Sequence, residues 1–127
     1  MQPKTQRQLK VNEELKKVAQ DFFQRNSSGS SMITVTAADV SKDLKKANIY
    51  ITVLPQDKEL SALDFAKRMR TDMRSDIKKR LPIKSIPFVE IEIDEGEKTR
   101  QRIESVLLKD RLDRPSKNVD EDEIEYL

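Results

Sequence analysis

The sequence predicts an α+β domain in which helices pack on one face of a three-stranded sheet. Three observations predict it. Two segments with alternating β-branched residues, 32–40 and 47–55, follow each other closely. A third such segment lies at 88–94, and apolar residues recur every three or four positions around these segments. The expected order is α-β-β-α-(kink)-α-β-α, in a chain of 127 residues.

The first helix is expected over about residues 5–25, where Thr5 and Gln8 fit a capping box at the helix start. Its apolar stripe repeats at helical spacing and consists of Val11, Leu15, Val18 and Phe22. The polar segment 26–31 connects this helix to the first strand.

An antiparallel hairpin is expected from the next two segments. In the first of them, one face carries Ile33, Val35 and Ala37. The alternation is clearer in the second, where one face carries Ala47, Ile49, Ile51 and Val53. Ser41 and Asp43 lie in the connection and can hydrogen-bond their own backbone, which is typical of a tight turn.

Helical spacing returns between about 58 and 81, and Pro82 ends this helix because it disfavours helical geometry at the preceding residue. The apolar side consists of Ala62, Ala66, Met69, Met73, Ile77 and Leu81. Unbroken, the helix would span roughly 33–36 Å, whereas a domain of this size has a radius of gyration of about 13–14 Å. We therefore expect a kink near Thr71, a weak helix former at the centre of the segment.

The third strand, 88–94, alternates apolar with acidic residues. We interpret the acidic residues as a solvated strand face rather than as a catalytic carboxylate cluster. A turn at Glu95 and Gly96 is expected next, followed by a last amphipathic helix over about 98–109.

The composition gives little support for an enzyme. There is no histidine and no cysteine, the two glycines are isolated, and no nucleophile, phosphate-loop or metal motif occurs. Neither a signal peptide nor an apolar run of membrane-spanning length is evident, so we expect a soluble cytoplasmic protein without a metal site.

Charge is distributed unevenly, although the net charge is only +2. Residues 110–127 carry a net −4, and we expect them to be a disordered tail after a domain of residues 1–109. Residues 67–84 carry eight basic and two acidic side chains, a net +6, which indicates a polyanionic partner.

The alternative for this basic segment is an ordinary solvated helix face. Asp72 can pair with Arg68, and Asp76 with Lys79 or Arg80, at helical spacing. Four cations remain without a local partner and share one strip of the helix, namely Lys67, Arg70, Arg74 and Lys78. Composition alone leaves both interpretations open.

Aromatic side chains for base stacking are few. Six are present, of which Phe22 and Phe65 are assigned to the core, whereas Phe88 is not assigned. We therefore expect recognition of the backbone or shape of folded RNA rather than base stacking.

Three stretches carry a family resemblance: "RQLKVNEELKKV", "ITVTAADVSKDLKKANIYITVLP" and "RLPIKSIPFVEIEIDEGEKTRQRIESVLL", which together cover about residues 5–109. Pro87, Phe88, Asp94 and Ile103 fit as well. The set resembles the bacterial ribosome-binding factor A family, which has a type II KH-like fold. That family replaces the Gly-x-x-Gly loop of other KH domains by a helix kink marked Ala-x-Gly. Here the kink position is occupied by Met69, Arg70 and Thr71, so we expect a shallower or shifted kink.

The resemblance implies a non-catalytic assembly factor of the small ribosomal (30S) subunit. Such a factor binds immature particles, aids maturation of the 5′ end of 16S rRNA and leaves the finished particle. The resemblance implies no cofactor and, in some bacteria, a GTPase that assists release, and we expect a monomer. The family's RNA contacts map here onto Lys4, Arg7, Lys10, Arg70, Arg74, Lys78, Lys79, Arg80 and Lys84. Lys67, from the strip, is a further candidate RNA contact. The secondary candidates lie in the hairpin turn and are Lys42, Lys45 and Lys46.

Two other functions remain open at this point. One is a KH-like module that acts on another RNA or on mature ribosomes. The other is a protein-interaction adaptor whose charge serves solubility alone.

Overall fold

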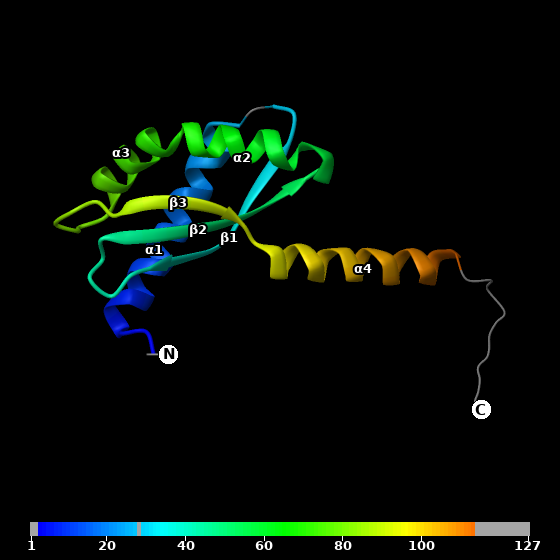
Figure 1. Cartoon of the computed structure of the whole chain (residues 1–127), viewed down its shortest axis with the longest axis horizontal. Helices are drawn as coiled ribbons and strands as arrows, with labels where there is room; N and C mark the ends of the chain where they lie inside the picture. Colours follow the sequence, from blue (N-terminus) through cyan, green and yellow to red (C-terminus); the bar gives the residue numbers. More distant parts are fainter. Residues whose placement is uncertain (1–2, 28, 114–127) are drawn as a thin grey trace. The chain divides into compact units, whose positions relative to one another are not determined.

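The structure, a computed structural model, describes residues 3–27 and 29–113. Residues up to Glu95 form one compact unit, and those from Gly96 on belong to a second. The elements follow the expected order with one added 3₁₀ turn, η1 (Figure 1). They are α1 (Gln6–Arg25), β1 (Met32–Val40), β2 (Lys46–Leu54), η1 (Gln56–Lys58), α2 (Glu59–Arg68), α3 (Arg70–Arg80), β3 (Phe88–Ile93) and α4 (Glu95–Asp113).

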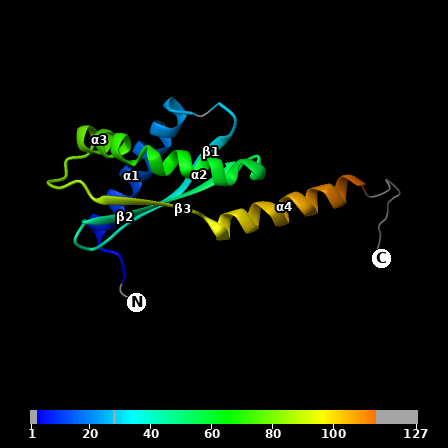
Figure 2. The ribbon, with the colours of Figure 1, turned by 45° about the horizontal axis from the view of Figure 1, so that its top comes forward.

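The sheet has the order β1-β2-β3, with β2 antiparallel to β1 and parallel to β3. The parallel pair requires a crossover, which α2 and α3 supply. All four predicted inward residues of β2 are buried, together with Val89 and Ile91 of β3. They belong to one apolar cluster with residues of α1, α2 and α3. α1 packs mainly on β1, α2 contacts β2 and β3, and α3 lies against α1 (Figure 2).

A bulge in β1 changes which residues face the core. Val35 pairs with Ile51 and Ala37 with Tyr50, so Thr36 is the additional residue. Ile33 and Val35 are buried as predicted, but beyond the bulge Ala38 and Val40 pack on the core in place of Ala37. The expectation for Ala37 was wrong because one additional residue reverses the period-two alternation.

The kink between α2 and α3 is present at Met69, the first of the three residues to which the resemblance assigns it, and two residues before Thr71, the position expected from helix propensity. The N–H of Met69 donates to the carbonyl oxygens of Phe65 and Ala66, at 3.1 and 3.2 Å. Met69 has φ −89° and ψ 6°, in the bridge region, which is allowed to L-residues and lacks the positive φ that favours glycine, so the kink requires no glycine. Thr71 is an ordinary residue of the first turn of α3.

α4, which from Gly96 on belongs to the second unit, begins at Glu95 rather than after a turn at Glu95 and Gly96. The first N–H groups of a helix have no intrahelical partner, which makes a glycine acceptable there, and acidic side chains in the first turn favour the positive end of the helix dipole. α4 also extends to Asp113, four residues into the segment predicted as a tail. The rest of that segment, 114–127, lies outside the described residues.

Candidate nucleic-acid interface

The turn between β1 and β2 is held by side chains, as its sequence predicts. Ser41 Oγ donates to Asp43 Oδ1 at 2.7 Å and accepts from the N–H of Lys46 at 3.0 Å. The same Asp43 oxygen accepts from the N–H of Lys45 at 3.1 Å. The Ser41 hydrogen bond first, and the Lys45 N–H next, hold the pKa of the Asp43 carboxyl below its ordinary value. The turn thereby presents three exposed lysines, Lys42, Lys45 and Lys46.

The start of α1 is fixed beside this turn. The predicted capping box is present, with Thr5 Oγ1 accepting from the N–H of Gln8 and Gln8 Oε1 accepting from the N–H of Thr5. Gln8 is buried, and its Nε2 donates to the carbonyl oxygen of Val40 at 3.0 Å. Lys4 Nζ lies 2.5 Å from Asp39 Oδ1. The exposed cations before and within this first part of α1 are Lys4, Arg7 and Lys10.

The loop from α3 to β3 reaches the same end of the sheet. The N–H of Phe88 donates to the carbonyl oxygen of Lys45 at 2.8 Å. Arg74 of α3 donates through Nε and Nη2 to the carbonyl oxygens of Pro87 and of the residue before it, at 3.1 and 3.3 Å. These contacts hold the end of this loop at the hairpin turn, and the loop carries the exposed Lys84.

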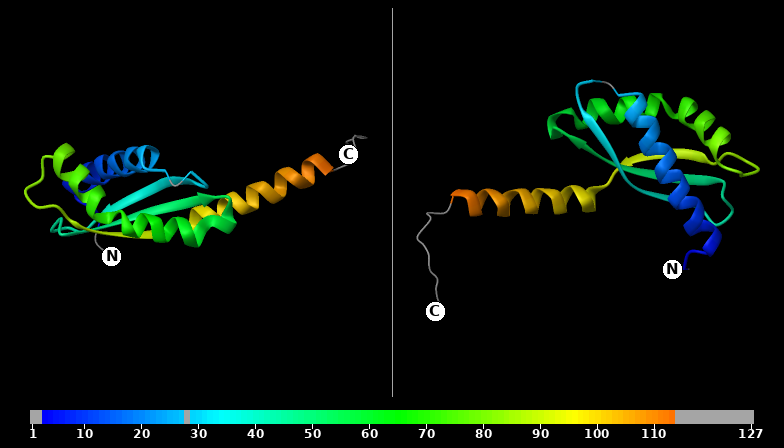
Figure 3. Two further views of the ribbon diagram at one scale, coloured as in Figure 1. Left: turned by 90° about the horizontal axis from the view of Figure 1, so that it is seen from above. Right: turned by 180° about the vertical axis from the view of Figure 1, so that it is seen from behind.

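Three segments distant in sequence therefore place basic side chains at one end of the sheet. The start of α1, the hairpin turn and the loop from α3 to β3 lie together in both views of Figure 3. We call this region the basic end and define it by Lys4, Arg7, Lys10, Lys42, Lys45, Lys46 and Lys84.

The predicted strip on the α2–α3 segment is only partly available to a partner. Arg70 Nη1 lies 3.6 Å from Glu90 Oε1, and its guanidinium lies 5.7 Å from the ring centroid of Phe88. With Arg74 bonded to the loop, two of the four cations contact β3 or the residues before it. The sequence leaves all four without a local partner, and the structure gives Arg70 and Arg74 partners distant in sequence, which helical spacing does not reveal. Within residues 3–27 and 29–113 the structure shows no ion pair for the exposed Lys67 and Lys78.

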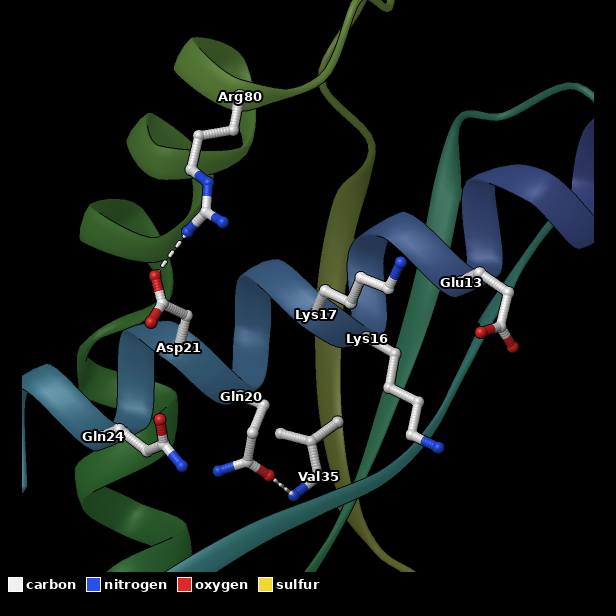
Figure 4. A pocket seen from close by; sticks show the side chains of 8 residues that line it. All are labelled: Glu13, Lys16, Lys17, Gln20, Asp21, Gln24, Val35 and Arg80. Atoms are coloured by element: carbon white, nitrogen blue, oxygen red, sulfur yellow. Dashed lines mark hydrogen bonds and ion pairs between the residues drawn. The ribbon is translucent and has the colours of Figure 1, made fainter.

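The pairing predicted for Asp76 within α3 was also wrong, because both Asp76 and Arg80 find partners on α1. Asp76 pairs with Arg25, and Arg80 Nη1 lies 2.6 Å from Asp21 Oδ2 (Figure 4). The hydrogen bond to Asp76 is the main cause that raises the pKa of the Arg25 guanidinium. Arg80 thus joins two helices, whereas Lys79 is exposed. The hollow of about 490 Å³ in Figure 4 is lined by charges of both signs and lies apart from the hairpin turn.

Phe88, which the sequence left unassigned, is 49% exposed. Val89 and Ile91 of the same strand are buried against the helices, so Phe88 points to the opposite face of the sheet. This face, which carries alternate residues of the three strands on the side away from α1–α3, is called the open face below. The alternation of residues 88–91 was the signal that could have identified Phe88.

The described residues contain neither a metal site nor a membrane-spanning helix. Among residues 3–27 and 29–113, no three potential metal-ligating side chains lie close enough to hold an ion. No helix in the same residues is long and apolar enough to cross a membrane.

Two sets of coordinates for the Thermus thermophilus ribosome-binding factor A share this fold. The crystal structure of ribosome-binding factor A from this organism matches with a TM-score of 0.61 at 20% identity, over 66% of this chain and 92% of that one. A homology model of the T. thermophilus protein, fitted into the cryo-EM map of a 30S–RbfA complex, matches with a TM-score of 0.56 at 20% identity, over 62% and 86%. The likenesses confirm the α+β fold predicted from the sequence.

Sequence comparison gives the family. The profile described as ribosome-binding factor A matches residues 7–107. Ribosome-binding factor A of Caldicellulosiruptor bescii is 27% identical over 93% of this chain and 94% of the relative. That of Clostridium acetobutylicum is 30% identical over 79% of this chain and 86% of the relative. The chain therefore belongs to the ribosome-binding factor A family.

Proposed function

We propose that this protein is a non-catalytic assembly factor that binds the immature 30S subunit and aids maturation of the 5′ end of 16S rRNA. Membership of the family is the observation that carries this proposal. The basic end and the likeness to a T. thermophilus protein fitted into a 30S–RbfA map support it. The protein acts as a monomer in the cytoplasm without a cofactor, and an assembly GTPase assists its release.

The basic end supplies the attraction to RNA. Seven cations from three segments gather there, while the nearby Asp39 is already paired with Lys4. Each lysine or arginine that contacts a phosphate displaces condensed counterions, so binding depends on salt rather than on base sequence. If about five phosphates are contacted, log K falls with log salt at a slope of roughly −3.5 to −4.5.

Sedimentation of a tagged copy of the full chain in sucrose gradients tests the proposal. We expect it with free small-subunit particles that contain 5′-extended 16S rRNA, and we expect such particles to accumulate when the protein is depleted. Sedimentation with polysomes would instead support a module that acts on mature ribosomes. Recovery at the top of the gradient would support the adaptor function. Either result contradicts the proposal.

A further inference from the structure

We propose that the open face of the sheet, at the basic end, binds one unpaired RNA nucleotide whose base stacks on Phe88. This inference rests on the proposed function, because it names the kind of nucleotide that the same end of the molecule recognises. It adds one stacked base to the expected recognition of the backbone or shape of folded RNA.

The position of Phe88 provides the first argument for a nucleotide site, because its ring is exposed and lies among cations. Phe88 lies at the start of an edge strand, and about half of its surface is exposed. Its register partner on β2 is Lys46, and its N–H bonds the backbone of Lys45. The Arg70 guanidinium lies over the ring. An exposed aromatic ring among cations is the arrangement that holds unpaired nucleotides, since the base stacks while the cations attract the phosphates.

A hollow lined by Lys46, the register partner of Phe88, and by Glu90, two residues farther along β3, provides the second argument; Phe88 itself does not line it. It has a volume of about 270 Å³, and its polar lining comes from all three strands and from the segment before α1. The polar lining residues are Lys4, Asp39, Ser41, Lys46, Asn48 and Glu90. Asn48 lies in the middle, because its register partners are Asp39 on β1 and Glu90 on β3. Its side-chain amide has both donors and an acceptor, which suits the polar edge of a base.

The charges around Phe88 and the hollow provide the third argument, because they leave a positive excess there. Two carboxylates face the hollow and would repel a phosphate, but each has a cation beside it. Asp39 pairs with Lys4 at 2.5 Å, and Glu90 lies 3.6 Å from Arg70. Within the described residues Lys46 has no ion pair, so this region keeps a positive excess. Farther along β3 the exposed Glu92 has no ion pair among those residues, which confines the nucleotide to the Phe88 end of the open face.

An affinity measurement with two RNA probes tests the inference. The probes are a random-sequence pool of single strands of about eight nucleotides, a typical site size, and a fully paired duplex of the same length. The variants of the full chain are F88A, F88L and F88Y. F88L keeps an apolar side chain at the position, and F88Y keeps an aromatic ring. Leu60→Ala is the matched control, because Leu60 is an exposed apolar residue of α2.

We expect F88A and F88L to lose about 5- to 140-fold in affinity for the single strands, as one stacked base contributes about 1–3 kcal/mol. Their affinity for the duplex stays unchanged, and F88Y and L60A bind both probes like the wild type. The inference is overturned if the wild type does not bind single strands, if F88L binds them as well as the wild type, or if F88L loses both probes equally.

The test is separate from that of the proposed function. A wild-type protein that sediments with 30S precursors, together with an F88L variant that binds single strands normally, overturns only the stacking site. A wild-type protein absent from those particles, together with the expected loss in F88L, overturns only the assembly function and supports the nucleotide site.

Discussion

Arg74 of α3 donates a hydrogen bond from Nε to the carbonyl oxygen of Pro87, 3.1 Å away, immediately before β3 begins. A second bond from Nη2 reaches the preceding carbonyl at 3.3 Å. We expect Arg74→Ala to lower the free energy of unfolding by about 1–3 kcal/mol, because two carbonyl groups lose a charged donor. Lys78→Ala, at an exposed position of the same helix, is the control and leaves stability unchanged. Urea denaturation measures both, and equal stabilities would contradict a structural role for Arg74.

The salt dependence of RNA binding should change when Lys45 is removed, but not when a lysine beyond the other end of β2 is removed. Lys45 belongs to the basic end, whereas Lys58 lies in η1, beyond the far end of that strand. Removing one phosphate contact reduces the slope of log K against log salt by about 0.7–0.9. We expect this change in Lys45→Ala and an unchanged slope in Lys58→Ala, measured by titration of small-subunit precursors. The same slope in both variants would show that the hairpin turn does not contact phosphates.

Features of the fold that depend on neighbouring residues were predictable from the sequence. The capping box at Thr5, the turn at Ser41 and Asp43 and the alternation of β2 are each determined within a few residues. The bulge at Thr36 was not predictable, since nothing in its own sequence marks it and its effect appears only in the pairing with β2. The length of the helical segment predicted a kink without locating it, whereas the family resemblance assigned it to residues 69–71, where the structure has it.

In the candidate site, too, features set by neighbouring residues were predictable and features set by distant segments were not. Which residues are basic is evident from the sequence, but which of them have partners within the protein depends on distant segments. Arg74 bonds a loop thirteen positions away, Arg70 contacts β3, and Arg80 pairs with α1. Exposed lysines in turns were easier to identify, because a polar turn has few neighbours that could engage them.

Gln20 of α1 closes part of the outer edge of β1. Its Oε1 accepts from the N–H of Val35 at 2.7 Å, and its Nε2 donates to the carbonyl oxygen of Ile33 at 3.4 Å (Figure 4 shows the first). We expect Gln20→Ala to cost about 1–3 kcal/mol, because a partly buried N–H loses its partner. The variant also aggregates more readily, since an unpaired strand edge can pair with another chain. Thermal melting and light scattering measure the two effects, with the exposed Gln24→Ala as the control; a variant that matches the control would contradict this role.

The pH dependence of stability tests the hydrogen bonds of the hairpin turn. Because the pKa of Asp43 is lowered in the folded state by the Ser41 hydroxyl and the Lys45 N–H, its ionised form stabilises the protein. That contribution is present above the unfolded-state pKa of about 3.9 and is lost as pH falls through the lower folded-state value. We expect Asp43→Ala to melt below the wild type at neutral pH. The difference shrinks as pH falls below about 4 and disappears only below the lower folded-state pKa of Asp43. A difference that persists in acid would show that the ionised carboxylate is not responsible.

The position of the kink at Met69 predicts whether Thr71→Gly stabilises or destabilises the protein. If Thr71 had a strained backbone conformation at the kink, glycine would relieve that strain, and Thr71→Gly would stabilise the protein. In the structure Thr71 is helical and the kink is at Met69, whose φ of −89° carries no strain. We therefore expect Thr71→Gly to destabilise the protein by about 0.3 kcal/mol, the difference in helix propensity between threonine and glycine. Ser75→Gly, at an exposed position farther along α3, is the control and changes stability in the same direction. Opposite signs for the two variants in chemical denaturation would place the kink at Thr71 after all, because only a position outside regular helical geometry gains from glycine.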